Sequence, residues 1–267
     1  MLLKYFVTAT LKNSRIWALG IMQMLVWLFL IAFVFSQGVT GTYNEILPGI
    51  SVWYGYIALA SFSTLAVVLA STTLYSNFSL AYCFKFTKLS QKSYIIDLLG
   101  SFSILAIFLS SIHLIATCII FSFRFNLSLI PINPIGAIIV SILAGCFMMD
   151  FGLLLSLIAI NYSGLQSVGV MNFIPIMSTI VFGLSQIFTK LPEPLLIISP
   201  FNEIESLLFQ GYSNQTPHQQ LMDMSTKTLS WEFLLLLLLI WIAVLTISNV
   251  FLLNHLNPRN IEEARPI

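Results

Sequence analysis

The side chains with the most potential for chemistry are ionisable residues inside long apolar stretches, and Asp150 and His113 are two of them. An acid in the interior of a membrane is by default a hypothesis for a functional site. Asp150 lies about 16 residues from the predicted outer end of its stretch, hence roughly 24 Å deep. His113 lies in the outer half of the preceding stretch, so the two differ in depth by roughly 18 Å. That separation argues against a His-Asp proton relay.

Each of these polar residues also has a structural interpretation. Asp150 is either a pathway residue or an acid that is protonated or hydrogen-bonded near the inner interface, and His113 is more simply a packed, hydrogen-bonded residue. Asn172 and Pro175 in the next stretch predict a bend that lines a pathway, because proline frees a backbone carbonyl group. A simple packing kink is the alternative at that position.

Catalytic and metal-binding patterns are not found in the sequence. It contains no HExxH, no GxSxG and no GxxxxGK[ST] phosphate loop. Cys83, Cys118 and Cys146 have no CxxC spacing and are interpreted as packing residues. Glu203 and Glu205 are two positions apart, so on a helix they point in different directions, and both are predicted to be solvated. The sequence therefore predicts no enzyme, no metal site and no cofactor bound by this chain.

The composition is that of an integral membrane protein. Of the 267 residues, 58% are hydrophobic and 8% are charged, and the mean hydropathy is +0.95. Soluble domains carry about 25% charged residues. Nearly the whole chain is needed for spans and their connections, which leaves no room for a soluble catalytic domain. A net charge of +1 is too small to suggest binding to nucleic acid, and no basic patch interleaved with aromatic residues is evident in the sequence.

The elements that must position these side chains are six predicted membrane-spanning helices, since a span needs about 20 mostly apolar residues. With the N-terminus inside, eight Lys and Arg residues fall in cytoplasmic segments and three fall outside. This asymmetry predicts that both termini face the cytoplasm. The predicted spans are residues 16–35, 52–75, 98–123, 135–160, 165–188 and 233–253.

Two segments on the predicted cytoplasmic side favour contact with the bilayer surface or with a partner. Residues 1–15 predict an amphipathic helix in the inner interface, and a simple positive flank that sets topology is the alternative. The loop 76–97 is rich in aromatic residues, which favours either a docking surface or rings that rest on the bilayer. The polar face of the helix holds Lys4, Thr8, Lys12 and Arg15, and its apolar face holds Leu2, Phe6 and Ala9.

Residues 190–229 are too apolar for an ordinary loop and too interrupted for a span. Pro192, Pro194 and Pro200 remove amide donors and restrict the residues before them, so one straight helix cannot cross the membrane here. The Leu and Ile clusters between them are typical of short helices that need an apolar surface. We predict a re-entrant helical hairpin at the outer membrane boundary. Pro192 and Pro194 lie at its start, and the turn from Pro200 to Asn202 lies at its tip.

The order of these features resembles the membrane subunit of ATP-binding-cassette exporters of the ABC-2 class. YNEILPGI, which ends at Ile50, is similar to the family's LPG motif before the second span. The stretch GLLLSLIAINYSGLQSVGVMNFIPIMSTIVFGLSQIFTKLPEPL is similar to its fourth-to-fifth-span signature. SPFNEIESLLFQG takes the place of its NP-x-x-[YF]-x-x-x-x-[LI]-R stretch, with Pro200 at the proline and Gln210 near the position of the arginine.

The resemblance implies an all-α permease with a fold like that of type V exporters. Its parts are an elbow helix at 1–15 and one six-span domain at 16–267, which includes a coupling loop at 76–97, an extracellular hairpin at 190–229 and a cytoplasmic tail at 254–267. It also implies a location in the cell membrane, pairing with a second permease copy or a related chain, and a separate ATPase subunit that binds ATP and magnesium. The candidates for coupling to that subunit are Lys4, Lys12, Phe78, Tyr82, Phe84, Lys85, Phe86 and Lys88. The pathway candidates are Asp150, Asn172 and Pro175, and the hairpin candidates are Pro192, Pro194, Pro200 and Asn202.

Two other functions remain open. A six-span secondary transporter or channel commonly has internal repeats or several charges at mid-membrane, and neither pattern is evident. A membrane scaffold without transport activity is the third hypothesis. Pathway walls of Leu, Ile and Phe do not distinguish a drug, a lipid, a glycan and a peptide as the substrate.

Overall fold

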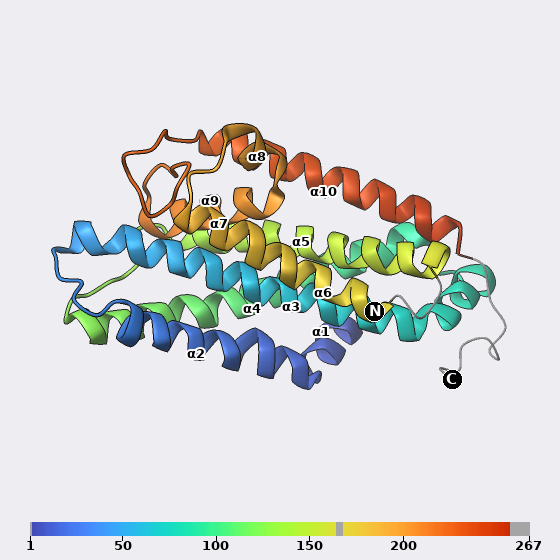
Figure 1. The fold of residues 1–267 in the computed structure, drawn as a ribbon. Coiled ribbons are helices and arrows are strands. Elements are labelled where there is room, and N and C mark those ends of the chain that lie inside the picture. The colour runs from blue at the N-terminus through green and yellow to red at the C-terminus, as the bar shows by residue number, and fades with distance from the viewer. Residues whose placement is uncertain (1, 164–167, 257–267) are drawn as a thin grey trace.

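The protein is a bundle of long apolar helices (Figure 1). The computed structural model describes residues 2–163 and 168–256, and the side chains of 75, 77, 78 and 162–172 lie outside what it describes. Within the described residues every extended regular element is a helix. The helices are α1 Leu2–Leu11, η1 Ile16–Met22, α2 Gln23–Leu30, η2 Ile31–Phe35, α3 Tyr43–Phe86, α4 Gln91–Phe125, α5 Pro134–Ile158, η3 Ala159–Ser163, α6 Val168–Ser178, η5 Thr179–Gly183, α7 Leu184–Phe188, α8 Glu193–Ile198, α9 Pro200–Ser213 and α10 Trp231–Asn254.

Five of the described helical segments are long and apolar enough to cross a membrane, which makes this a multi-pass membrane protein. They correspond to the predicted spans one, two, three, four and six. The predicted fifth span comprises α6, η5 and α7, and residues 164–167 at its start lie outside the described residues. A sixth span therefore stays a prediction. The five segments are Ile16–Phe35, Tyr43–Leu74, Gln91–Phe125, Pro134–Asn161 and Trp231–Asn254.

The helix that contains the second predicted span is much longer than that span. Most of residues 76–97, predicted as the connection to the third span, is helical, because α3 continues to Phe86 and α4 already begins at Gln91. The role of this segment as a coupling loop stays a prediction. At the other end, α3 begins at Tyr43, in what the sequence predicts to be an outer loop. Pro48 lies in the second turn of this helix, where its missing N–H removes one backbone hydrogen bond and its ring crowds the carbonyl group of Asn44.

Side-chain caps explain where several helices begin. Thr42 and Glu45 form a capping box at the start of α3, in which each side chain satisfies a free backbone amide of the first turn. The hydroxyl of Ser90 accepts a hydrogen bond from the amide of Ser93 at the start of α4, and the hydroxyl of Ser230 accepts one from Phe233 at the start of α10. Helix boundaries thus depend on polar residues that hydropathy does not detect.

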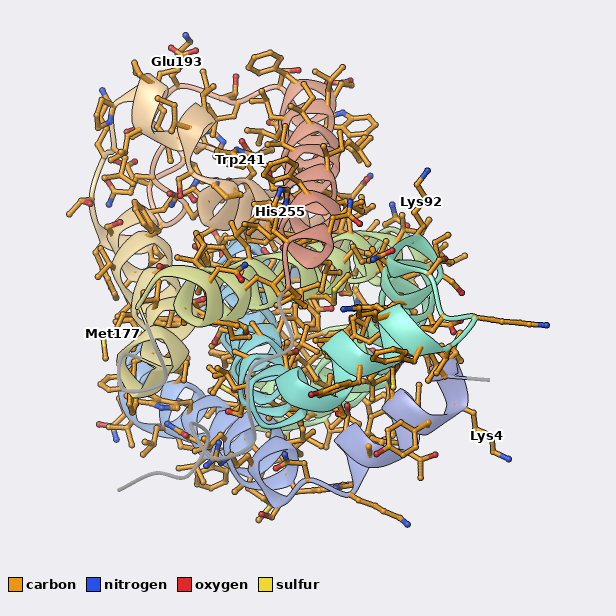
Figure 2. All side chains as sticks on the ribbon, turned by 90° about the vertical axis from the view of Figure 1, so that its right-hand side faces the viewer. Lys4, Lys92, Met177, Glu193, Trp241 and His255 are labelled. Atoms are coloured by element: carbon orange, nitrogen blue, oxygen red, sulfur yellow. The ribbon has the colours of Figure 1, made fainter. Side chains whose placement is uncertain are left out.

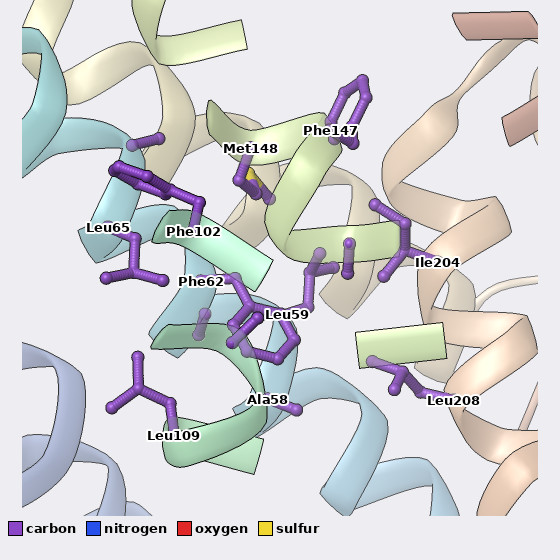
Figure 3. Close-up of a cluster of buried hydrophobic side chains, with 14 of the residues drawn as sticks. Ala58, Leu59, Phe62, Leu65, Phe102, Leu109, Phe147, Met148, Ile204 and Leu208 are labelled. Carbon is purple, nitrogen blue, oxygen red and sulfur yellow. The ribbon is translucent and has the colours of Figure 1, made fainter. Parts of the chain in front are cut away.

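Helix α5 lies at the centre of the bundle, where it contacts α3, α4, α9 and α10. Two glycines of α5 allow its neighbours to approach closely. A methyl group at Gly152 would lie 2.6 Å from the carbonyl oxygen of Ala66 in α3, and one at Gly145 would lie equally close to Ala106 in α4. Large apolar side chains fill the remaining space (Figure 3), among them Phe62, Leu65, Phe102, Leu109, Phe147, Met148, Ile204 and Leu208.

The N-terminal helix α1 packs against the start of α4. Phe6 makes an edge-to-face contact with Tyr94, with 5.6 Å between the ring centroids, and the hydroxyl of Ser101 donates to the carbonyl oxygen of Leu3. The predicted polar face is exposed, but Ala9, predicted on the apolar face, is exposed as well and Thr10 is buried instead. The buried face of α1 therefore differs from the predicted one and is set by its contact with α4. We call this end of the bundle the α1 end, and the opposite end, which carries α8 and α9, the α8 end (Figure 1).

Candidate functional site

A large cavity lies between the first predicted span, α3 and the helices η5 and α7. Its volume of about 1020 Å³ is at the upper end of the range of small-molecule sites. Its walls are mostly apolar and aromatic. The aromatic lining residues are Trp27, Phe35, Trp53, Tyr56, Phe121, Phe125, Phe173 and Phe188, and the polar ones are Gln23, Ser36, Glu45, Ser63, Thr64 and Thr179.

One face of α3 supplies much of the cavity wall. Trp53, Tyr56, Ala60, Ser63 and Thr64 are spaced by three and four residues, which places them along one side of a helix. The sequence interpretation missed this face. Its signal is visible in the sequence, since aromatic, small and hydroxyl residues recur at helical spacing within an otherwise aliphatic span.

Glu45 lines the cavity from the first turn of α3. Its Oε2 accepts hydrogen bonds from the backbone N–H of Thr42 at 2.7 Å and from the Thr42 hydroxyl at 3.0 Å. No described residue donates to its Oε1. An exposed glutamate is ionised at neutral pH, so this carboxylate brings a negative charge to an apolar space.

The prediction that Glu203 and Glu205 are solvated is wrong, because both side chains are fully buried. The two residues do point in different directions, but α3, α5, η5, α8 and α10 cover α9 on its several sides. Neither carboxyl group has a hydrogen-bond partner among the described residues. Burial raises the pKa of Glu203 to about 8 and raises the pKa of Glu205 well above its usual range.

Glu205 lies directly behind the cavity wall. Its Oε2 is 3.3 Å from the position that a Cβ atom would take at Gly183, and the ring of Tyr56 comes within 3.0 Å of the same position. The buried acid and the aromatic ring that lines the cavity are therefore neighbours. Sequence pattern alone offers no signal for this contact, since it joins α9 to η5 and α3.

Helices α8 and α9 occupy the region predicted as a hairpin. Pro192 precedes α8, Pro194 lies in its first turn, and Pro200 begins α9 after a break at Ser199, whose backbone is extended. Asn202 is buried and fixes the start of α9, because its Nδ2 donates to the carbonyl oxygen of Phe182 at 2.8 Å and to Oε1 of Gln186 at 3.0 Å. Gln186 in turn donates to the hydroxyl of Ser206 at 2.7 Å. Whether the pair re-enters the membrane and caps a pathway stays a prediction.

Asp150 joins α5 to α10 and does not line the cavity. Its Oδ2 accepts a hydrogen bond from the hydroxyl of Thr246 at 2.6 Å, and its Oδ1 accepts one from Nδ2 of Asn249 at 3.0 Å. The sequence interpretation did not find these two partners on α10. His113 is held at a different contact, where its Nε2 lies 3.0 Å from the carbonyl oxygen of Gly20. Asp150 and His113 thus have separate hydrogen-bond partners, which supports the interpretation of both as packed, hydrogen-bonded residues.

The bend expected near Pro175 coincides with a change in helix type. Pro175 is buried within α6, and the π-helical segment η5 begins four residues later. Phe173, Ile176 and Met177 from the same region line the cavity. The side chain of Asn172, the other residue predicted there, lies outside the described residues.

The α1 end carries an exposed surface of aromatic and basic side chains, which we call the α1-end surface. Tyr82 and Phe86 stack with 6.0 Å between their ring centroids, and Nζ of Lys85 lies 5.7 Å from the centre of the Phe86 ring. Phe86 is 70% exposed, whereas Phe84 is half-buried against Tyr94 and contributes less. The side chain of Phe78 lies outside the described residues. The exposed members of this surface are Lys4, Lys12, Tyr82, Lys85, Phe86 and Lys88.

This surface is open to a partner from the end of the bundle. Figure 2 looks onto the α1 end and shows the side chains of Lys4 and Lys92 directed away from the helices. Lys4 belongs to α1 and Lys92 to the first turn of α4, which follows directly after α3. Three helices therefore present basic or aromatic side chains at one end of the molecule.

Comparison of the chain with protein-family models and with curated proteins finds no match. The resemblance to ABC-2 permeases therefore depends on the ordered set of features along the chain.

Proposed function

We propose that this chain is the membrane-spanning permease subunit of an ATP-driven exporter. It works as a dimer with a second copy or a related chain, in a cell membrane, with both termini in the cytoplasm. A separate nucleotide-binding subunit supplies ATP hydrolysis. The proposal rests on the resemblance to ABC-2 permeases and on one structural observation, the α1-end surface.

The α1-end surface supports docking of a partner because it combines what protein interfaces favour. Exposed aromatic rings supply apolar contact area, and the lysines around them supply a positive rim. Bilayer contact is the competing explanation for exposed rings. The stacked pair of Tyr82 and Phe86 lies in the last turns of α3, beyond the segment Tyr43–Leu74 that is apolar enough to span a membrane. This position favours a protein partner.

Helix α3 also gives a mechanical connection between the two candidate sites. The same helix carries Phe86 at the α1 end and the cavity residues Trp53 and Tyr56 farther along. A partner that contacts the end of α3 differently in its two nucleotide states would favour one position of the cavity wall over another. Differential contact with two states is sufficient to shift the equilibrium between them.

The test is co-purification of the chain with an ATPase subunit from its native membrane. The variant Phe86→Glu should release the subunit, since it places a buried, unpaired charge in the contact. Met224→Glu is the matched control, because Met224 is an exposed apolar residue in the loop after α9, away from the α1-end surface. It should leave the complex intact.

Two results would contradict the proposal. The first is an unchanged complex with Phe86→Glu, which would show that the α1-end surface does not bind the ATPase subunit. The second is robust substrate movement by the purified chain alone in vesicles without ATP, which would favour a secondary transporter or a channel.

A further inference from the structure

The chemistry of the cavity selects among substrate classes. A site with apolar walls and a few convergent polar groups is the usual form of a small-molecule site. Here the described lining residues include one acid, Glu45, and no Lys, Arg or His. Arg124 lies behind Ser36 and Phe125, but it is not a lining residue. Its Nε and Nη2 donate to the carbonyl oxygens of Ala32 and Ser36. An anionic ligand such as a phospholipid headgroup would therefore find no basic side chain on the lining itself. A cation would find a carboxylate.

The position of that carboxylate strengthens the argument. Glu45 is anchored by Thr42, which bonds Oε2 and fixes the side chain in the first turn of α3. Because Glu45 is exposed, solvent partly screens its charge, and we expect one fixed carboxylate to change affinity by about one order of magnitude. The capping box thus holds a negative charge on the cavity lining without the loss of side-chain entropy that a free glutamate would incur on binding.

The aromatic walls suit the other part of such a ligand. Trp27 from the first span and Trp53 and Tyr56 from α3 present rings to the same cavity. Rings of this kind attract cations through their faces and accommodate apolar groups by stacking. Glu205 lies behind Tyr56 without a partner among the described residues, so no basic side chain opposes a cation from that side either.

We propose that this cavity binds an organic cation with a bulky apolar body, whose charge lies toward Glu45 and whose body stacks on Trp27, Trp53 and Tyr56. As the substrate class of an exporter, this inference rests on the proposed function. As a binding site it needs only the chain itself, so the test uses binding and no transport.

The experiment measures equilibrium binding of radiolabelled tetraphenylphosphonium to the full chain in nanodiscs of zwitterionic lipid, with empty nanodiscs as background. Tetraphenylborate, an anion of nearly the same size and shape, is measured in separate samples in the same way, because mixed with the cation it would form an ion pair. We expect saturable binding of the cation and binding of the borate that is at least about tenfold weaker after subtraction of the empty-nanodisc background. Equal affinities for the two ions would overturn the charge argument, and the absence of saturable cation binding would overturn the proposal as a whole.

Matched variants separate charge from folding. Glu45→Gln removes the charge but keeps the cap, because glutamine at this position also completes a capping box, and we expect affinity to fall about tenfold. Glu193→Gln removes a half-buried acid that pairs with Lys227 and does not line the cavity, and it should leave affinity unchanged. Equal affinities for wild type and Glu45→Gln would overturn the proposal. A second result would also overturn the proposal. If Met177→Cys crosslinks two copies of the chain and the probe does not bind, a second copy fills the cavity.

The two proposals fail separately. Loss of ATPase association with intact cation binding would refute the exporter and leave the site. Failure of cation binding with an intact ATPase complex would refute the site and leave the exporter.

Discussion

The contact between Asp150 and α10 offers a direct test of what holds the last span in place. Thr246→Val removes one hydroxyl while conserving shape, and Asp150→Ala removes both carboxylate oxygens. The double mutant then isolates the Asp150–Thr246 interaction, because each single change removes that hydrogen bond. The hydrogen bond from Asn249 Nδ2 to the backbone carbonyl oxygen of Asp150, at 2.9 Å, involves neither altered side chain, so we expect it in every variant.

The magnitude follows from the geometry. Hydrogen bonds between membrane helices contribute about 0.6 kcal/mol on average and at most about 1.7 kcal/mol. The Thr246–Asp150 distance of 2.6 Å is short for a hydroxyl donor and a carboxyl acceptor, so we expect a coupling energy of about 1–1.7 kcal/mol. Asp150→Ala alone should cost more, about 2–4 kcal/mol, because it also leaves the Asn249 amide short of one partner and opens a small cavity.

The assay is unfolding of the purified chain in mixed micelles by added dodecyl sulfate, followed by tryptophan fluorescence. Ser248→Ala is the control on the same helix, since Ser248 is half-buried and its hydroxyl donates only to the Val244 carbonyl oxygen of its own helix. It should change stability by less than about 0.5 kcal/mol. A coupling energy below about 0.3 kcal/mol would refute the reasoning, because Asp150 would then not fix α10 against α5.

Three further predictions test the fold and its electrostatics. Gly152→Ala should destabilise the chain by about 1–3 kcal/mol in the same assay, because its methyl group would meet the Ala66 carbonyl oxygen, whereas Gly49→Ala has open space and should not. Lys227→Ala should cost less than about 1 kcal/mol despite the 2.6 Å ion pair with an acid of α8, because both groups are solvated; a larger loss would refute this. Between pH 4.5 and about 8, Glu203 keeps its proton in the folded chain and loses it in the unfolded chain. The free energy of unfolding should therefore fall as pH rises through that range, by up to about 1.4 kcal/mol per pH unit, and level off above it. Glu203→Gln should flatten this part of the pH profile, and a slope equal to that of wild type would contradict the assignment.

The sequence predicts the spans well because the signal for a span is local. Five described apolar helices coincide with predicted spans, since hydropathy over about 20 residues needs no knowledge of neighbours. Helix ends are different. Thr42 and Ser90 fix where α3 and α4 begin through hydrogen bonds of single side chains, so hydropathy misplaced both boundaries.

Burial within the bundle could not be predicted from one segment. The sequence shows that Glu203 and Glu205 point in different directions, but whether either direction is solvated depends on the helices packed around α9. The cavity is an intermediate case. Its α3 face, with Trp53 and Tyr56, has helical spacing that the sequence displays, while the opposite wall comes from spans that are distant in the chain.

The length of α3 has a consequence for motion. Its 44 residues form one unbroken helix, about 66 Å long at 1.5 Å per residue, against a hydrocarbon core of about 30 Å. The helix extends well beyond the bilayer, and a continuous helix moves largely as one body. A tilt of about 5° about one end displaces the other by about 6 Å, a distance larger than one helical turn. A small rotation at Phe86 would thus become a movement of several ångströms toward the other end of α3, with no intervening loop to absorb it.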